Sequence, residues 1–337
     1  MAPEPRSYRN LVMEGGGIRG IAYGGALQEL EQRGVLAGIQ RVGGTSAGAI
    51  QAALLAVGYS ATEIIAIVNH TPVQRLNDGR FIFFGGSTRL VKQYGWYRGD
   101  QFTKYLSELV GKRTGNPDLT LGQLHQLAQA GQARDLYVTG TNLTLQRVEV
   151  FSYETHPQLR VADAVRISMS IPLYFRAVLL DEQGKVVLKP KKNQKVNVLV
   201  DGGLLANYPI NLFDDAKYLV GNQGQTGPMT GRVFNSETLG LRLDRAEQIA
   251  YDTLRSGRQQ LAPHDISNFG SYVGALYTLA IENLNLAQPD DWKRTVSIST
   301  LGFNPKIKRI SDQQKQQLMQ SGQQGVQSFF NLPQTKN

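Results

Sequence analysis

The segment RVGGTSAGAI, residues 41–50, contains a G-x-S-x-G pattern in which Ser46 stands between Gly44 and Gly48. This pattern is typical of a nucleophile elbow, a sharp turn from a strand into a helix that exposes a serine hydroxyl. Glycines flank the serine because the turn crowds the backbone and leaves no room for side chains. The segment therefore predicts that Ser46 is a nucleophile and that the amide of Ala47, at the helix start, donates to a developing oxyanion.

A second glycine-rich turn precedes the elbow, in the segment EGGGIRG. Gly15, Gly17 and Gly20 fit G-x-G-x-x-G, which is also the pattern of a dinucleotide-binding turn. That use requires an acidic residue at the end of the next strand to bind a ribose, but the next strand ends in the elbow instead. We therefore favour an anion nest, in which successive glycine amides bind the oxyanion of an acyl intermediate and Arg19 locks the turn or stabilises negative charge.

A third segment, VNVLVDGGLLANYPI, places Asp201 at the end of an apolar strand and before two glycines. In a sheet of mostly parallel strands, such a side chain reaches the crevice at the carboxyl edge. A carboxylate with a pKa near 4 is a weak base for a hydroxyl, so burial must raise its pKa and a short hydrogen bond must align it.

The usual base beside a nucleophilic serine is a histidine, and the chain has four. Only His264 follows the serine and the acid in the chain order of α/β-hydrolases. His70, His125 and His156 stand at a helix end, on a helix face and in a turn before a proline. We expect structural roles for all four.

Strands and helices alternate around these motifs, which predicts an α/β fold with a central, mostly parallel sheet covered on both faces. Asp100 is expected to be the N-cap of a helix at residues 101–113. A hairpin is expected at residues 175–190, a polar loop at 221–231, and helices at 266–287 and 311–330. The remaining predicted strands and helices are strands at 10–13, 39–46, 135–144, 147–154, 195–200, 236–244 and 295–300, and helices at 21–33, 47–60, 119–129 and 161–170.

The composition indicates a globular protein, because 41% of the 337 residues are hydrophobic and 19% are charged. The sequence contains no run of 18 or more apolar residues, so no transmembrane helix is predicted. It also has no apolar stretch near the N-terminus that would predict a signal peptide. We therefore expect a cytoplasmic location, with export as an effector left open. The absence of cysteine excludes disulfides, thiolate metal sites and a cysteine nucleophile.

A net charge of +9 favours an anionic partner: a membrane surface, a nucleic acid or a phosphorylated ligand. Nucleic-acid binding is not expected, since no basic motif interleaved with aromatic residues is present. The segment KPKKNQK places Lys189, Lys191, Lys192 and Lys195 either in a patch that faces lipid headgroups or in a solvated loop. The run of Phe81, Ile82, Phe83 and Phe84 is either a lid or membrane-insertion element or a buried strand.

The motifs GGGIRG, GTSAG and DGG occur in this order, together with SMSIPLYF at residues 168–175 and NYPI at 207–210. In this combination the chain resembles the patatin-like phospholipase family. The resemblance implies a three-layer α/β/α fold and a single catalytic domain at residues 8–330. It further implies a variable, lid-like region at about 77–135 and flexible termini at 1–7 and 331–337.

The resemblance also implies a catalytic dyad of Ser46 and Asp201 in place of a triad. Its oxyanion element is the turn formed by Gly15, Gly16, Gly17, Ile18 and Arg19, and neither a metal nor a cofactor takes part in catalysis. The implied activity is hydrolysis of fatty acyl esters in phospholipids or lysophospholipids, at an anionic membrane surface. The alternatives are a carboxylesterase or acyltransferase with the same dyad, and a catalytically silent lipid-binding or signalling module. An activating partner or small-molecule signal is left open.

Overall fold

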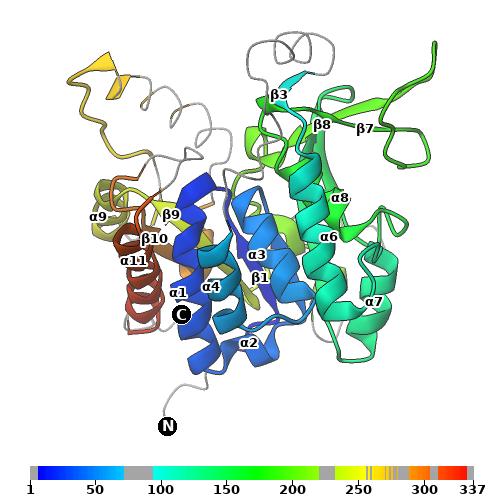
Figure 1. Ribbon diagram of the computed structural model, residues 1–337. Coiled ribbons are helices and arrows are strands. Elements are labelled where there is room, and N and C mark those ends of the chain that lie inside the picture. Colours follow the sequence, from blue (N-terminus) through cyan, green and yellow to red (C-terminus); the bar gives the residue numbers. More distant parts are fainter. Residues whose placement is uncertain are drawn as a thin grey trace.

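A computed structural model describes residues 7–71, 94–219, 232–255, 257–258, 260–269, 271–272, 275, 279, 288–303 and 310–331 (Figure 1). The strands are β1 (Asn10–Met13), β2 (Arg41–Gly44), β3 (Gly95–Tyr97), β4 (Asp135–Asn142), β5 (Arg147–Phe151), β6 (Leu173–Phe175), β7 (Val178–Leu180), β8 (Asn197–Asp201), β9 (Thr238–Asp244) and β10 (Thr295–Ser299). The α-helices are α1 (Ala22–Gln32), α2 (Val35–Gly38), α3 (Ala47–Ala56), α4 (Ala61–His70), α6 (Asp100–Thr114), α7 (Leu121–Gln129), α8 (Val161–Ser168), α9 (Ala246–Leu254) and α11 (Asp312–Asn331). Short 3₁₀ turns are η1 (Gly17–Ile21), η3 (Gly202–Leu204), η4 (Ile210–Phe213), η5 (Ala216–Tyr218) and η6 (Pro289–Arg294).

The central sheet has the strand order β10-β9-β1-β2-β4-β8-β7, and β5 pairs with β4 beside this path. The pairs β10–β9, β9–β1, β1–β2 and β2–β4 are parallel, whereas β4–β8, β8–β7 and β4–β5 are antiparallel. The predicted α/β class and the mostly parallel sheet are therefore confirmed. The antiparallel end of the sheet holds the strand that carries Asp201.

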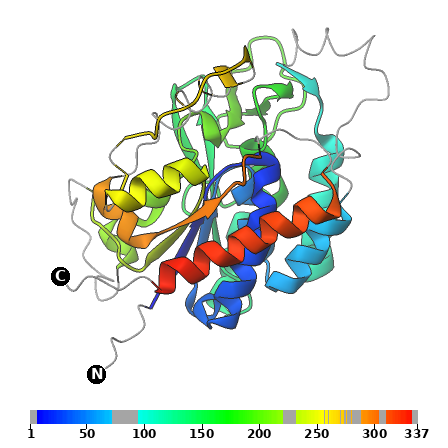
Figure 2. The same ribbon diagram turned by 90° about the vertical axis from the view of Figure 1, so that its left-hand side faces the viewer.

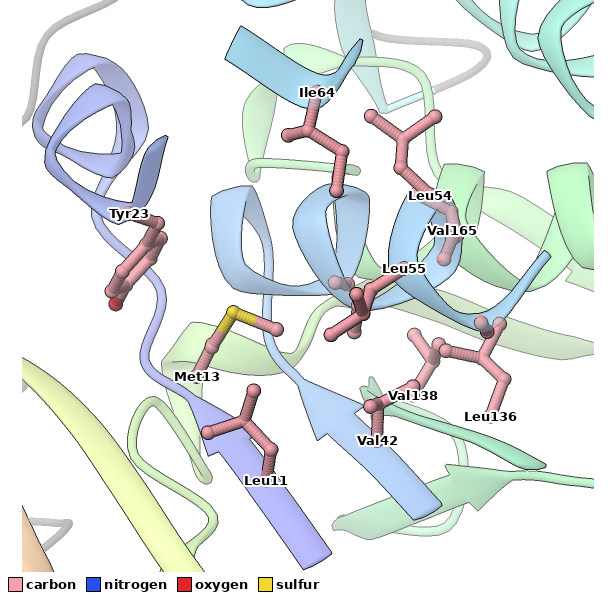
Figure 3. Packing of buried hydrophobic residues seen from close by; sticks show 14 of the residues in the cluster. Leu11, Met13, Tyr23, Val42, Leu54, Leu55, Ile64, Leu136, Val138 and Val165 are labelled. Atoms are coloured by element: carbon pink, nitrogen blue, oxygen red, sulfur yellow. The ribbon is translucent and has the colours of Figure 1, made fainter. Parts of the chain in front are cut away.

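Both faces of the sheet are buried. Successive side chains of a strand point to opposite faces, so neighbouring residues of one strand belong to different cores. Leu11 and Met13 of β1 belong to the larger core, beneath α1, α3 and α11, while Val12 belongs to a smaller core with the segment 208–218. Figure 3 shows Met13 of β1 and Leu55 of α3 pointing toward one another across the larger core. Helix α9 lies on the other side of the sheet from α1 and α11 (Figure 2).

Several boundaries differ from those expected from the sequence. Helix α6 begins at Asp100 itself, with Gly99 as its N-cap, so the prediction that Asp100 is the N-cap is wrong. The Asp100 carboxylate forms ion pairs with Arg176 and Arg98, with N–O distances of 2.9 and 3.4 Å. The sequence analysis did not predict helices α4 and α9. The loop expected at 221–231 and most of the helix expected at 266–287 lie outside the described residues.

The predicted hairpin turn is present, since the amide of Asp181 donates to the carbonyl of Lys185 at 3.0 Å. Its second strand is reduced to a bridge between Leu180 and Val186, and β7 pairs along its length with β8. Within the described ranges, no helix is both long and apolar enough to cross a membrane.

Candidate active site

Ser46 lies at the corner between β2 and α3, with a backbone φ of +52°. This left-handed conformation is unusual for a residue other than glycine and is retained only where the surrounding structure holds it. A β-carbon on Gly44 would lie 2.6 Å from the backbone carbon of Gly48, so the turn can close only where side chains are absent. The predicted strand–turn–helix arrangement is therefore present, and it presents a serine with only 6% of its surface exposed.

Asp201 reaches the level of Ser46 through the register of β4, which lies between β2 and β8. Gly44 pairs with Val138 of β4, and two residues further along β4 Gly140 pairs with Asp201. The elbow turns two residues after Gly44, and its Ser46 side chain lies near the Asp201 carboxyl. The sequence pattern suggested an acid at the carboxyl edge of parallel strands. Because β8 is antiparallel to β4, Asp201 instead meets β4 inside its length.

The Asp201 carboxyl is buried, and its two oxygens differ in their hydrogen bonding. Its Oδ1 accepts a hydrogen bond of 2.7 Å from the amide of Gly203. Its Oδ2 is buried and accepts no well-aligned hydrogen bond within the described part of the chain. Burial raises the pKa of Asp201 to about 7, although hydrogen bonding from the Gly203 amide and from the nearby Ser46 hydroxyl lowers it. The carboxyl thus lies beside the serine and titrates near neutral pH.

The glycine turn lies directly against the elbow. A β-carbon on Gly15 would lie 3.2 Å from Cβ of Ser46 and would collide with Oδ1 of Asn207. Two of the predicted oxyanion donors are already engaged, since the Gly15 amide donates to the Asn207 carbonyl and the Arg19 amide to the Gly16 carbonyl. The amides of Gly16, Gly17, Ile18 and Ala47 donate to no acceptor among the described residues. The Arg19 side chain closes the turn through a hydrogen bond of 3.2 Å from its Nε to the Gly16 carbonyl.

Glu14 and Asn207 support this turn, although the sequence analysis assigned a role to neither of them. Nδ2 of Asn207 donates to Oε1 of Glu14 at 3.0 Å, and the other carboxylate oxygen of Glu14 accepts from the Leu243 amide at 2.6 Å. These bonds join the turn to β9 and to the segment that follows Asp201. Asn207 lies in the NYPI segment, and the resemblance of that segment to the family was the one feature of the sequence that pointed to this residue.

The end of α8 contacts both Ser46 and Asp201, and the sequence analysis did not assign these residues a role either. Ser168 Oγ accepts a hydrogen bond of 2.8 Å from the Ser46 amide. Ser46 Oγ donates to Sδ of Met169 at 3.6 Å. The carbonyl of Ser170 accepts from the Asp201 amide at 2.9 Å. The segment SMSIPLYF was noticed only for its resemblance, because serine and methionine in a buried segment have no chemical signature.

None of the four imidazoles hydrogen-bonds to Ser46 or Asp201 within the described ranges. His125 Nδ1 lies 2.7 Å from Oδ1 of Asp135, His70 contacts the Ala66 carbonyl, and His264 contacts the Asp265 carbonyl. His156 packs against the ring of Phe151. These contacts are consistent with the structural roles expected for all four.

The lysines of the predicted headgroup patch are exposed on the loop between β7 and β8. Leu188 beside them has 68% of its surface exposed. This loop leads directly into the strand that carries Asp201. The run at residues 81–84 lies outside the described residues.

The fold and this site together define an α/β protein whose candidate active site is a serine at a strand-to-helix turn beside a buried carboxyl. A family model described as patatin-like phospholipase matches residues 11–214, which is more than half of the chain. The chain therefore belongs to the patatin-like phospholipase family.

Three curated relatives are similar over about three fifths of the chain. They are the uncharacterized protein YqhO of Bacillus subtilis (36% identical; 61% of this chain and 67% of that protein), the uncharacterized protein R571 of Acanthamoeba polyphaga mimivirus (30%; 61% and 62%) and the probable lipid hydrolase 463L of Invertebrate iridescent virus 6 (26%; 62% and 64%). The match therefore spans about two thirds of the length of each relative.

Two solved structures share the fold over almost the whole chain. VipD from Legionella pneumophila has a TM-score of 0.55 and 18% identity, covering 96% of this chain and 67% of that one. ExoU in the ExoU–SpcU complex from Pseudomonas aeruginosa has a TM-score of 0.51 and 20% identity, covering 96% of this chain and 51% of that one. At these identities the likeness shows the fold alone.

Proposed function

We propose that this protein is a lipid acyl hydrolase that cleaves fatty acyl esters of phospholipids or lysophospholipids with a dyad of Ser46 and Asp201. The observation that carries the proposal is the buried Asp201 carboxyl, which lies near the Ser46 hydroxyl and whose Oδ2 atom has no well-aligned partner within the described residues. A buried polar atom of this kind is costly to leave unsatisfied, so a functional role explains its position. Catalytic hydrogen bonds are often poorly aligned before substrate binds and tighten in the complex.

In the first half-reaction, Ser46 Oγ attacks the ester carbonyl carbon and its proton passes to Asp201 Oδ2. The carbonyl electron pair moves onto the oxygen and gives a tetrahedral intermediate. Collapse of the intermediate breaks the ester C–O bond, and the proton on Asp201 passes to the departing alcohol oxygen. Water then repeats these steps on the acyl-serine, releasing the fatty acid and restoring Ser46.

The oxyanion of each intermediate is bound by amides of the glycine turn and the elbow. Because the Gly15 and Arg19 amides are engaged, Gly16, Gly17, Ile18 and Ala47 are the candidate donors. Each donor of this kind contributes roughly 3–4 kcal/mol to transition-state stabilisation in serine hydrolases. The oxyanion element therefore contributes much of the rate, which offsets the weakness of a carboxylate as a base.

The choice of a lipid substrate rests on the family and on the relative named a probable lipid hydrolase. A general carboxylesterase or an acyltransferase would use the same residues and differ only in the acyl acceptor or the leaving group. A silent lipid-binding module is less well supported, because Ser46 and Asp201 are both present and lie together. We place the enzyme at the cytoplasmic face of a membrane, with export as an effector as the alternative. Fractionation of the source cells and their medium distinguishes the two locations.

The lysine loop is proposed to bind anionic headgroups. Each lysine near an anionic surface contributes about 1 kcal/mol of binding free energy, so changing all four to glutamate should abolish binding to phosphatidylserine vesicles. Hydrolysis of a water-soluble ester should be unaffected, because the loop is exposed. Retained vesicle binding at low salt would contradict this role.

The experiment that tests the function measures fatty-acid release from mixed phospholipid vesicles by the wild type, Ser46→Ala and Asp201→Ala. The control is Ser321→Ala, which removes a buried serine hydroxyl of α11 that donates to the carbonyl of Ser299 in β10. We expect release by the wild type and by Ser321→Ala only. Equal release by all four proteins would refute the dyad. Hydrolysis of short soluble esters without any release from vesicles would favour the carboxylesterase.

A further inference from the structure

The hydroxyl of Ser168, the last residue of α8, accepts a hydrogen bond from the backbone amide of Ser46 and does not bond to the Ser46 hydroxyl. We propose that Ser168 is a positioning residue, whose hydroxyl holds the backbone of Ser46 in its reactive conformation. This inference rests on the proposed function of Ser46 as the nucleophile.

The Ser46 amide has no place in the hydrogen-bond ladder of α3. Ser46 is the N-cap of that helix, and amides at a helix N-terminus have no partner within the helix. The Ser168 hydroxyl supplies the missing acceptor at 2.8 Å, and both residues are buried, at 0% and 6% exposure. The bond therefore satisfies a buried amide in the one residue of the elbow with a left-handed backbone.

Removing this acceptor would leave the Ser46 amide buried and unsatisfied. The peptide between Thr45 and Ser46 would then be driven to rotate toward another acceptor, and the rotation would turn both the Ser46 hydroxyl and the adjacent amide of Ala47. The bond also keeps the Ser46 amide out of the oxyanion site, which leaves Ala47 as the donor that the elbow contributes.

The same short segment fixes the other side of the site. The carbonyl of Ser170 accepts from the Asp201 amide, and Met169 touches the Ser46 hydroxyl. Arg166 braces the segment by donating to the carbonyls of Arg98 and Arg176, at 2.7 and 2.9 Å, and to the Ser170 hydroxyl. Three consecutive residues therefore set the position of Ser46 relative to Asp201. Among them, Ser168 accepts a hydrogen bond from the nucleophile's backbone through its side chain, so a substitution can remove that bond.

The alternative is that Ser168 only fills space in the core. Ser168→Thr and Ser168→Val separate the two, because their side chains have nearly the same shape and only threonine keeps the hydroxyl. Ser168→Ala tests the loss of the bond without added volume. Ser321→Ala again removes a buried, hydrogen-bonded serine hydroxyl far along the chain.

The experiment measures kcat and KM on p-nitrophenyl butyrate, together with the rate at which a fluorophosphonate phosphonylates Ser46 and displaces fluoride. In Ser168→Ala, kcat and the phosphonylation rate should both fall by about 10- to 100-fold, with KM changed by less than about twofold. Ser168→Thr should be at least several-fold faster than Ser168→Val. Ser321→Ala should keep the wild-type kcat per labelled site even if it melts at a lower temperature.

The pH profile separates the loss of the hydrogen bond from loosened packing, because packing that admits water to Asp201 would lower the pKa of its carboxyl. In Ser168→Ala, the midpoint of the acid limb of kcat should not fall below that of the wild type. The burial of Asp201 and its bond from Gly203 are unchanged, and only the bond from the Ser46 hydroxyl, which lowers the pKa of Asp201, is weakened. A wild-type rate in Ser168→Ala, equal rates in the threonine and valine variants, or an acid limb displaced to lower pH would overturn the inference. If the wild type itself neither turns over ester nor labels at Ser46, the proposed function fails and this inference fails with it.

Discussion

Replacing Asp201 with asparagine should abolish hydrolysis and, at the same time, stabilise the folded protein relative to the wild type as the pH rises. The cause is that the folded protein buries a carboxyl with 5% of its surface exposed and with no cationic partner among the groups that shift its pKa. Ionisation at this site is therefore unfavourable. Asparagine has nearly the same shape and does not ionise.

The magnitude follows from the pKa in the folded and unfolded states. Burial raises the pKa of Asp201 to about 7 in the folded protein. In an unfolded chain it is near 3.9. Because the folded-state pKa is the higher one, the contribution of the protonated carboxyl is fully present below about pH 4 and is lost as the pH rises through about 7. Over that range the free energy of unfolding of the wild type should fall by about 4 kcal/mol relative to Asp201→Asn, and about 3 kcal/mol of this lies between pH 5 and pH 8.

Urea unfolding of both proteins at pH 5 and at pH 8 measures this difference. Subtracting the unfolding free energy of one protein from that of the other removes the contribution of all other titrating groups, which the two proteins share. Asp215→Asn is the matched control, because it makes the same change of net charge at an exposed residue. The gap in unfolding free energy between Asp201→Asn and the wild type should widen toward pH 8 by clearly more than that of the control. A gap that stays constant or narrows would refute the raised pKa, and with it the basis for a carboxylate acting as the base.

Three further predictions concern activity. First, kcat/KM on a soluble ester should rise about tenfold per pH unit below an acid limb near pH 7, because Asp201 must be ionised to accept the proton; a limb near pH 4 would contradict this. Second, Gly15→Ala should lower fluorophosphonate labelling of Ser46 by about 100-fold or more, since its β-carbon collides with Asn207 and crowds Ser46; labelling at the wild-type rate would show that the turn does not constrain the site. Third, His264→Ala should retain hydrolysis of vesicle lipids, and a complete loss would mean that a histidine is the base.

The parts of the site that could be predicted from the sequence are those encoded by local backbone geometry. The elbow at Ser46 and the turn at residues 15–20 each require glycines at fixed spacing, and that spacing is visible in the sequence. The strands and helices that carry them were predictable for the same reason, because their apolar residues recur with the period of each element. Helix α4 was missed although the sequence marks it, since Ile64, Ile67 and Val68 pack against the core and Ser60 and Glu63 form a capping box at its start. Helix α9 is harder to predict, because its buried residues are the polar Gln248 and Asp252.

The contacts that join distant segments could not be predicted. The acceptors of Ser46 and Gly15 are Ser168 and Asn207, more than a hundred residues further along the chain. Neither residue type marks its partner, since a serine or an asparagine can bond to almost any buried amide. The antiparallel direction of β8 could not be predicted either, because a short apolar run looks the same in a parallel and in an antiparallel strand.

The antiparallel direction of β8 explains why the DGG motif has its glycines where it does. Asp201 meets β4 at Gly140, and the chain must then turn away across the neighbouring Thr139. A β-carbon on Gly202 would lie 2.5 Å from the Thr139 hydroxyl oxygen, so this turn needs a residue without a side chain. Gly203 then directs its amide back to the Asp201 carboxylate. Read alone, the motif is a common turn after a strand. Against β4 it keeps one oxygen of the Asp201 carboxyl hydrogen-bonded to Gly203 and holds the carboxyl near Ser46.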